Sequence, residues 1–388
     1  MPSPAESAGP PAVDWAARRR GPVGLVAPGR YTAGGVTVSR RAVDGDLAVT
    51  LPAPSAQTPH FRVHRLPAGV VVQHDLHPGE IDNDLATHIT AELFGRGPFR
   101  AAEDFEHCLV GLVVTSAEDP LEAWLRFYRN TLRRLRPGSP TIGPGAIADF
   151  ADIYATAAAL QSGSSALDVG CCFGFLAIRL AETWPFPSVT GLDRVAGTVR
   201  LLRDVLARLG PEVRPEPRIR PVCADATALP FPDASHDTAY AVHLLEHLEP
   251  AQTAMAVREL LRVARRRVVL AVPLENEPDA AFGHRQTFTV ARLVELGAAM
   301  GYPYTCFDQF GGWLVLDIPP NPPAPVPAGR PRRKETAMTE PNQDRPDGGA
   351  AEVEGAQSQS KQNPDLAGAA REVAEGTDER GAPTPGGG

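Results

Sequence analysis

Residues 167–177 have the sequence LDVGCCFGFLA, an apolar run in which Gly170 and Gly174 enclose the pair Cys171 and Cys172. Glycines where a strand meets a helix let backbone amides approach a ligand, and the N-terminus of the helix adds positive potential. The G-x-G-x-x-G spacing of dinucleotide-binding proteins is absent, because Cys172 occupies the position of the second glycine. The segment therefore favours a nucleoside ligand other than NAD.

A carboxylate and three histidines follow neighbouring strands further along the chain. Asp193 ends the segment SVTGLD, a position suited to accepting hydrogen bonds from ribose hydroxyls. His243 and His247 lie in HLLEHL, and His284 lies in FGHRQTF. An unperturbed histidine titrates at about 6.5 and can serve as a general base near neutral pH. The three histidines are therefore candidates for contact with a substrate other than the nucleoside ligand.

HLLEHL also matches the zinc-peptidase pattern H-x-x-E-H. Zinc binding would require both histidines on one face of a helix and a further ligand downstream. The motif instead follows a predicted strand, so we expect no metal here, and at most a loosely bound divalent cation at Glu246. Cys171 and Cys172 form no C-x-x-C motif and are interpreted as packing residues.

The elements that position these residues alternate between strand and helix from Ala146 onward. Such alternation predicts an α/β fold, a doubly wound parallel sheet that binds its ligand at the carboxyl ends of the strands. The segments YTCFDQF and WLVLDI are joined by a short glycine turn and predict an antiparallel hairpin at one edge. We assign residues 141–318 to this domain.

Residues 21–140 predict a smaller α+β domain. The stretch around Asp44 and Gly45 and the stretch RVHRLPAGVVVQHDL each indicate two strands. The segments IDNDLATHITAELF and DPLEAWLRFYRNTLRRL have helical periodicity, the second with Asp119 as its N-cap. CLVGLVVT is an uninterrupted apolar run, for which we predict a buried strand.

Composition limits the class of protein. Residues 1–20 and 319–388 are rich in Pro, Gly, Ala and charge, which predicts disorder. The formal net charge of -8 argues against nucleic acid as a partner. We find no transmembrane run, no signal pattern and no disulfide framework among the five cysteines, so we expect a cytoplasmic protein. The sequence does not indicate an oligomeric state.

Three segments, DVGCCFG, LPFPDASHD and HLLEHL, resemble those of class I S-adenosylmethionine-dependent methyltransferases in the same order. The resemblance covers residues 149–318 and implies a seven-stranded Rossmann-like sheet and S-adenosylmethionine as cofactor. It also implies that the methionine part contacts one group of residues, the ribose Asp193, and the adenine Asp225 and Ala226. The residues implied for the methionine part are Asp168, Gly170, Cys171 and Gly174.

A narrower resemblance extends over most of residues 23–318. The segments FRVHRLPAGVVVQHDLHPGEIDNDLATHITAELFG, VGLVVTSAEDPLEAWLRFYRNTL, CCFGFL and GGWLVLD are similar to those of mycofactocin oligosaccharide methyltransferases. That resemblance implies O-methylation of a sugar on a glycosylated small molecule. Because a sugar hydroxyl is a poor nucleophile, we expect a base, in the order of preference His284, His247, His243.

Two other functions stay open at this point. The first is methyl transfer to carbon or nitrogen of another small metabolite. The second is a non-catalytic scaffold that binds the cofactor.

Overall fold

The computed structural model describes residues 25–27, 29–41, 51–136, 147–183, 188–213 and 219–320. The predicted turn at Asp44 and Gly45 lies outside these residues, as do segment 1–20 and all of 319–388 except Pro319 and Pro320. No helix in the described ranges combines the length and the apolar character needed to span a bilayer.

The N-terminal part of the chain builds a six-stranded sheet in the order β1-β2-β3-β6-β5-β4. β5 and β6 form the predicted antiparallel pair, with Val63 opposite Val72. β3 and β6 pair in parallel. The strands are β1 (Leu25–Ala27), β2 (Arg30–Ala33), β3 (Val36–Arg40), β4 (Ala56–Gln57), β5 (Phe61–Leu66) and β6 (Gly69–His74).

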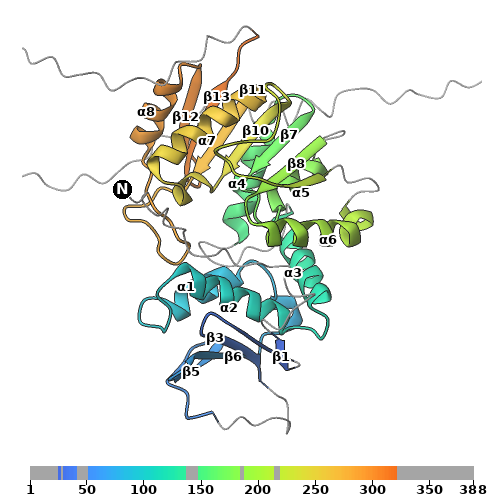
Figure 1. Ribbon diagram of the computed structural model, residues 1–388, viewed down its shortest axis with the longest axis vertical. Coiled ribbons are helices and arrows are strands. Elements are labelled where there is room, and N and C mark those ends of the chain that lie inside the picture. The colour runs from blue at the N-terminus through green and yellow to red at the C-terminus, as the bar shows by residue number, and fades with distance from the viewer. Residues whose placement is uncertain are drawn as a thin grey trace, which may run out of the picture. The chain divides into compact units, whose positions relative to one another are not determined.

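Helices α1 (Leu85–Leu93), α2 (Ala102–Val114) and α3 (Pro120–Leu135) follow this sheet, with the 3-10 turn η2 (Pro78–Glu80) before them. Figure 1 shows α1 and α2 above strands β3, β5 and β6 in the view. The predicted apolar stripe of α1 is confirmed, because its leucines and isoleucine are fully buried. Asp119 caps α3 as predicted by accepting a hydrogen bond from the backbone N–H of Leu121 over 2.8 Å.

The prediction of a strand at CLVGLVVT was wrong. The segment is the second half of α2, and residues 108–114 are all buried there. The helix begins with Glu103 and Asp104, whose charges favour a helix N-terminus. A helix enclosed on most sides has the same uninterrupted apolar run as a buried strand, so periodicity alone did not distinguish them.

The second sheet has seven strands in the order β12-β13-β11-β10-β7-β8-β9. β13 is antiparallel to both β11 and β12, which confirms the predicted edge hairpin, and the remaining pairs are parallel. The strands are β7 (Ser165–Val169), β8 (Ser188–Asp193), β9 (Ile219–Cys223), β10 (His236–Val242), β11 (Ala264–Val272), β12 (Tyr304–Asp308) and β13 (Gly312–Asp317).

Helices cover both faces of the second sheet, the arrangement of a Rossmann-like fold (Figure 1). One core cluster joins the sheet to α4 and α5, and another joins it to α7 and α8. The helices are α4 (Ile147–Ala159), α5 (Phe175–Thr183), α6 (Ala196–Val213), α7 (Pro250–Val263) and α8 (Val290–Met300), with the 3-10 turn η3 (Leu245–His247) after β10.

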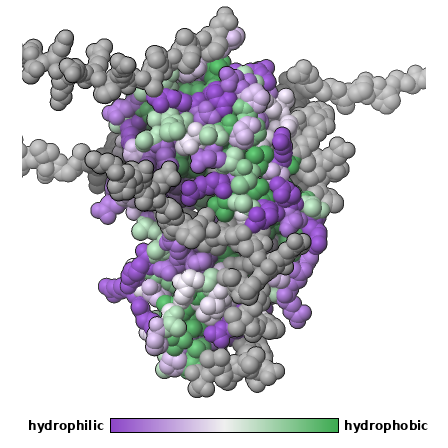
Figure 2. Space-filling view, in the orientation of Figure 1, coloured by the Kyte–Doolittle hydropathy of each residue, from purple (hydrophilic) through white to green (hydrophobic). Residues whose placement is uncertain are grey.

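A third core cluster joins the N-terminal sheet and its helices to the glycine segment, α5 and α6 of the second sheet. It includes Trp124 and Phe127 of α3 together with Phe173 and Phe175 at the start of α5. The rings of Trp124 and Phe173 lie 5.6 Å apart, and those of Phe127 and Phe173 lie 5.3 Å apart. The helices of the N-terminal part therefore pack directly beside the glycine segment. Figure 2 shows hydrophilic and apolar side chains interspersed over one face of the described residues.

Candidate active site

The glycine segment forms a tight turn between β7 and α5. The backbone N–H groups of Gly170 and Cys171 both donate to the carbonyl of Leu192, over 2.8 and 2.9 Å. Gly170 and Gly174 have φ of 76° and 74°, a left-handed conformation that glycine adopts without penalty. A Cβ at Gly170 would lie 2.8 Å from Cδ1 of Leu244, so a larger residue there would displace that side chain in addition to straining the backbone.

Cys171 and Cys172 differ in their surroundings. Cys171 is buried, as the packing interpretation expects, whereas Cys172 is exposed. Cys172 also has a φ of 47°, although it is not glycine. Four described residues other than glycine have a positive φ, and two of them, Cys172 and His243, line the same cavity. Such outliers cluster at functional sites because the surrounding structure must hold them in place.

Asp168 is the residue before the last of β7, beside this turn, and is 2% exposed. Its Oδ2 atom has no hydrogen-bond partner, although it borders the cavity. Burial, with the nearby charge of Asp193 as a weaker cause, raises the pKa of Asp168 to about 7. A buried carboxylate without a partner is costly, and a cationic group of a ligand would satisfy it.

Asp193 and Asp225 lie at the ends of the neighbouring strands. Oδ2 of Asp193 accepts a hydrogen bond from the N–H of Cys172 over 3.0 Å, and Oδ1 accepts one from Val195 over 2.8 Å. Asp225 is exposed and uses Oδ1 to accept bonds from the backbone and hydroxyl of Thr227. The cavity lining includes neither of these aspartates nor Ala226, so their predicted contacts with ribose and adenine stay predictions.

A cavity of about 570 Å³ lies between helices α1 and α2 and the carboxyl ends of the second sheet's strands. Its volume is typical of small-molecule sites, which enclose about 300–1,000 Å³. Residues from the segment predicted to contact the methionine part of the cofactor line the cavity: Asp168, Gly170, Cys171 and Cys172. The three predicted histidines line it as well: His243, His247 and His284. The glycine turn and the three histidines therefore line the same cavity.

Each histidine has a distinct set of contacts. His243 follows β10 in a left-handed conformation, and its Nδ1 lies 3.3 Å from Oε1 of Glu246. The ring centroids of His247 and His284 are 4.9 Å apart and nearly perpendicular. Burial lowers the pKa of His247. Nδ1 of His284 lies 2.8 Å from Oε2 of Glu275, a contact that fixes the orientation of the ring.

Sequence reasoning missed several residues that complete the cavity. Glu275 orients His284, and Glu106 of α2 borders the cavity, where burial raises its pKa to about 6. Phe105 of α2 and Phe282 of the loop before His284 meet edge-to-face at 5.3 Å and border the space. No local motif marks these positions, because tertiary packing alone brings the N-terminal helices to the cavity.

The comparisons with known proteins match this part of the chain. Residues 166–267 match the family model described as "Methyltransferase domain". The O-methyltransferase cnsE of Penicillium expansum is 35% identical over 108 residues, which are 28% of this chain and 37% of that protein. The chain therefore spans little more than a third of the curated relative that it matches.

Solved structures with a similar chain trace have low sequence identity. The magnesium protoporphyrin IX methyltransferase of Synechocystis PCC 6803, solved with bound SAH, is 16% identical, with a TM-score of 0.36 over 49% of this chain and 93% of that chain. A SAM-dependent methyltransferase of Methanosarcina mazei is 20% identical, with a TM-score of 0.34 over 42% and 95%.

Residues 166–267 thus match a methyltransferase domain, and they lie within the Rossmann-like second sheet and its helices. The site fits S-adenosylmethionine, because Oδ2 of Asp168 has no hydrogen-bond partner and this carboxylate borders the cavity, where an ammonium group could bind. Residues of the glycine turn border the same cavity.

Proposed function

We propose that this protein transfers the methyl group of S-adenosylmethionine to a hydroxyl oxygen of a glycosylated small molecule. The observation that carries the proposal is the single cavity that joins the glycine turn and Asp168 to the three histidines. S-adenosylmethionine supplies a methyl group on a sulfonium, and an acceptor hydroxyl must reach it after losing its proton. The histidine end offers groups for that proton, and orientation in a closed space contributes to the rate.

Transfer to oxygen has two supports. The curated relative carries the name O-methyltransferase, although its match covers only part of either chain. A hydroxyl acceptor also needs help with deprotonation, and histidines beside Glu246 and Glu275 are suited to give it. The chemistry of the cavity therefore favours a hydroxyl over a carbon acceptor that needs no base of this kind.

We further propose that the acceptor is an oligosaccharide such as that of mycofactocin. This narrower assignment rests on the resemblance over residues 23–318, which extends beyond the matched methyltransferase segment. Residues of α1 and α2, among them Thr87, Thr90 and Glu106, line the cavity from outside that segment. Polar side chains at these positions are suited to hydrogen bonds with sugar hydroxyls.

The test uses the full chain with isotopically labelled S-adenosylmethionine and a panel of oligosaccharide-bearing metabolites. Mass spectrometry locates the label, and calorimetry compares binding of S-adenosylmethionine with binding of NAD. We expect label on a sugar oxygen and no NAD binding. Label on carbon or nitrogen would contradict the acceptor assignment, and tight cofactor binding without turnover on the mycofactocin oligosaccharide would favour a scaffold.

A further inference from the structure

We propose that Glu246, His247 and His284 bind a divalent transition-metal ion at the acceptor end of the cavity. One ligand atom from each of the three residues lies within 4.8 Å of the other two. All three residues border the cavity. The ion's role in catalysis rests on the proposed function, whereas its binding does not. This proposal departs from the sequence-based expectation of no metal.

Glu246 is the strongest indication of a bound cation. Its side chain is 1% exposed, and neither of its carboxylate oxygens has a hydrogen-bond partner. Nδ1 of His243 is 3.3 Å from Oε1, within ion-pair distance when His243 is protonated, but the contact does not have the geometry of a hydrogen bond. Burial of a carboxylate whose oxygens accept no hydrogen bond costs several kcal/mol unless a cation lies beside it, and among the described residues only a protonated His243 could supply that charge at ion-pair distance. A metal ion bordered by this carboxylate would remove that cost.

The two histidines are each fixed through one side of the ring. Nδ1 of His284 contacts Oε2 of Glu275 over 2.8 Å, which leaves Nε2 for a metal. The backbone of Gly283 lies beside the ring of His247 and favours its N–H. Metal-binding histidines almost always donate their other N–H to a carboxylate or a backbone carbonyl, which orients the ring and raises ligand basicity. Both supporting contacts are present here.

Two imidazoles and one carboxylate select borderline transition ions such as Zn²⁺ over Mg²⁺, which prefers oxygen ligands. Three protein ligands leave a coordination position open toward the cavity. An acceptor hydroxyl bound there would lose its proton more readily, as metal-bound water does. His243 lies beside Glu246 but outside the ligand group, so it is placed to take that proton.

Methyl transfer to the acceptor oxygen breaks two bonds and forms two. The O–H bond of the acceptor breaks and its proton moves to His243. The oxygen forms a bond to the methyl carbon as the carbon–sulfur bond breaks, and its electron pair stays on sulfur. The products are the methyl ether and S-adenosylhomocysteine, and no oxidant or reductant is needed.

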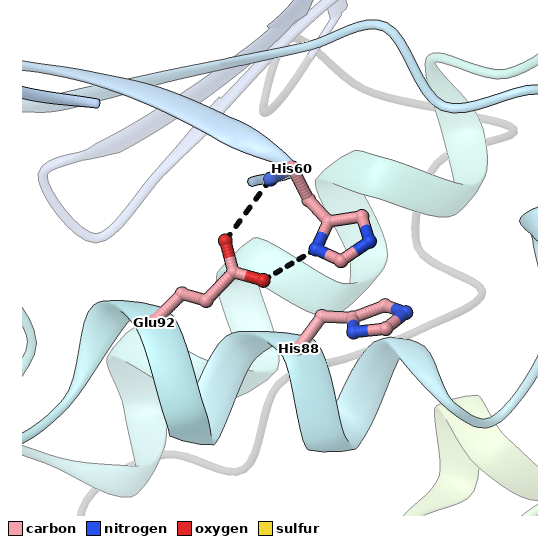
Figure 3. Close-up of side chains that lie close together, drawn as sticks. All are labelled: His60, His88 and Glu92. Carbon is pink, nitrogen blue, oxygen red and sulfur yellow. Dashed lines mark hydrogen bonds and ion pairs between the residues drawn. The ribbon is translucent and has the colours of Figure 1, made fainter. Parts of the chain in front are cut away.

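A second cluster in the described residues, His60, His88 and Glu92, provides a contrast. Figure 3 shows the carboxylate of Glu92 facing both the backbone N–H and Nδ1 of His60, so both of its oxygens already have partners. The rings of His60 and His88 stack with centroids 3.8 Å apart. Hydrogen bonds and stacking account for this cluster without an ion, which makes it a matched control.

The experiment begins with the full chain treated with a chelator, desalted and titrated with Zn²⁺ or Co²⁺. Metal content after gel filtration and the visible spectrum of the Co²⁺ form are measured without S-adenosylmethionine or acceptor. We expect one bound ion per chain and ligand-field bands of a site with nitrogen and oxygen ligands. Glu246→Gln and His284→Gln should lose the ion, and His88→Gln should keep it.

Glu275→Gln tests the supporting contact. It should keep the fold and weaken metal affinity about 10–100-fold. Melting temperatures establish that each variant is folded, and folded variants of Glu246 and His284 that retain the ion would overturn the proposal. So would loss of the ion in His88→Gln alone, or a wild-type chain that binds no Zn²⁺ or Co²⁺.

Cofactor binding is measured separately by calorimetry with S-adenosylmethionine. A chain that transfers methyl groups equally well after its ion is removed would overturn the ion's role in catalysis and leave the proposed function intact. A chain that binds the ion at Glu246 but not S-adenosylmethionine would overturn the proposed function and leave the metal site intact.

Discussion

The backbone N–H of Cys172 donates a hydrogen bond to Oδ2 of Asp193 over 3.0 Å. This bond ties the glycine turn after β7 to the end of β8, beside the bonds from Gly170 and Cys171 to the carbonyl of Leu192. Asp193 therefore has a structural role in the turn in addition to its predicted contact with ribose. Both roles bear on how the chain binds S-adenosylmethionine.

Replacing Asp193 by Ala should raise the dissociation constant of S-adenosylmethionine by at least about 100-fold. Hydrogen bonds to a charged acceptor contribute about 1.5–3 kcal/mol each, and the substitution removes two ribose bonds and the tie to Cys172. Asp225→Ala should weaken binding by no more than about tenfold, because it removes one exposed contact worth about 0.5–1.5 kcal/mol. Calorimetry measures both, and unchanged affinity in the Asp193 variant would show that the cofactor binds elsewhere.

Affinity for S-adenosylmethionine should rise with pH through neutrality. Burial raises the pKa of Asp168 to about 7, so below that pH its carboxyl is protonated and cannot pair with an ammonium group. Because the folded, ligand-free chain holds this proton more tightly than the unfolded chain, the stability that Asp168 contributes is lost as pH rises through about 7. Cofactor binding should regain it.

The measurement is the dissociation constant between pH 5.5 and 8.5. Below pH 7 we expect close to a tenfold weakening for each pH unit. Asp168→Asn has no titrating carboxyl and should bind weakly with a flat profile over this range. A wild-type profile as flat as that of the variant would contradict an ammonium contact at Asp168.

The left-handed backbone of Cys172 predicts a difference between two small substitutions. Cys172 has a φ of 47°, which costs a residue with a Cβ about 1–2 kcal/mol, whereas glycine pays no such cost. Greater chain entropy of glycine in the unfolded state offsets about 0.5–1 kcal/mol of this gain. Cys172→Gly should therefore be more stable than Cys172→Ala by up to about 1 kcal/mol, measured by urea unfolding. Equal stabilities would show that the turn relaxes at this residue.

The second sheet was predictable because its strands are short apolar runs that alternate with helical segments. SALDV and SVTGLD became β7 and β8 with their predicted bounds, Ser165–Val169 and Ser188–Asp193. The same rule failed for residues 108–115, where a helix buried on most sides has no polar face to reveal its period. For an apolar run that is buried on all sides, local pattern alone does not distinguish a helix from a strand.

The site residues that lie at or after the carboxyl ends of strands in the second sheet were predictable from the sequence. The site residues on other elements were not. Asp168, Gly170 and the three histidines follow strands of one sheet, so topology brings them to one edge. Glu275 was not predicted to support His284, because nothing in the loop sequence indicates that the two side chains meet. Glu106 comes from α2, whose approach to the cavity depends on packing of the N-terminal helices beside the glycine turn.

Separate glutamine substitutions of the three histidines should divide them by role. The metal proposal gives the proton to His243 instead of His284, because Glu246, His247 and His284 form the ligand group and His243 lies beside it. His243→Gln should lower turnover about 10²–10⁴-fold, the usual contribution of a general base, with metal content and cofactor affinity unchanged.

His247→Gln and His284→Gln should lose turnover together with the bound ion. Added Zn²⁺ at high concentration should restore part of their activity but none of the activity of His243→Gln, because that variant lacks a proton acceptor and not an ion. Rates are measured with the labelled methyl donor at saturating acceptor, and metal content is measured on the same samples. Near-normal turnover in all three variants would contradict any histidine role in the transfer, because alignment of acceptor and methyl group would then suffice.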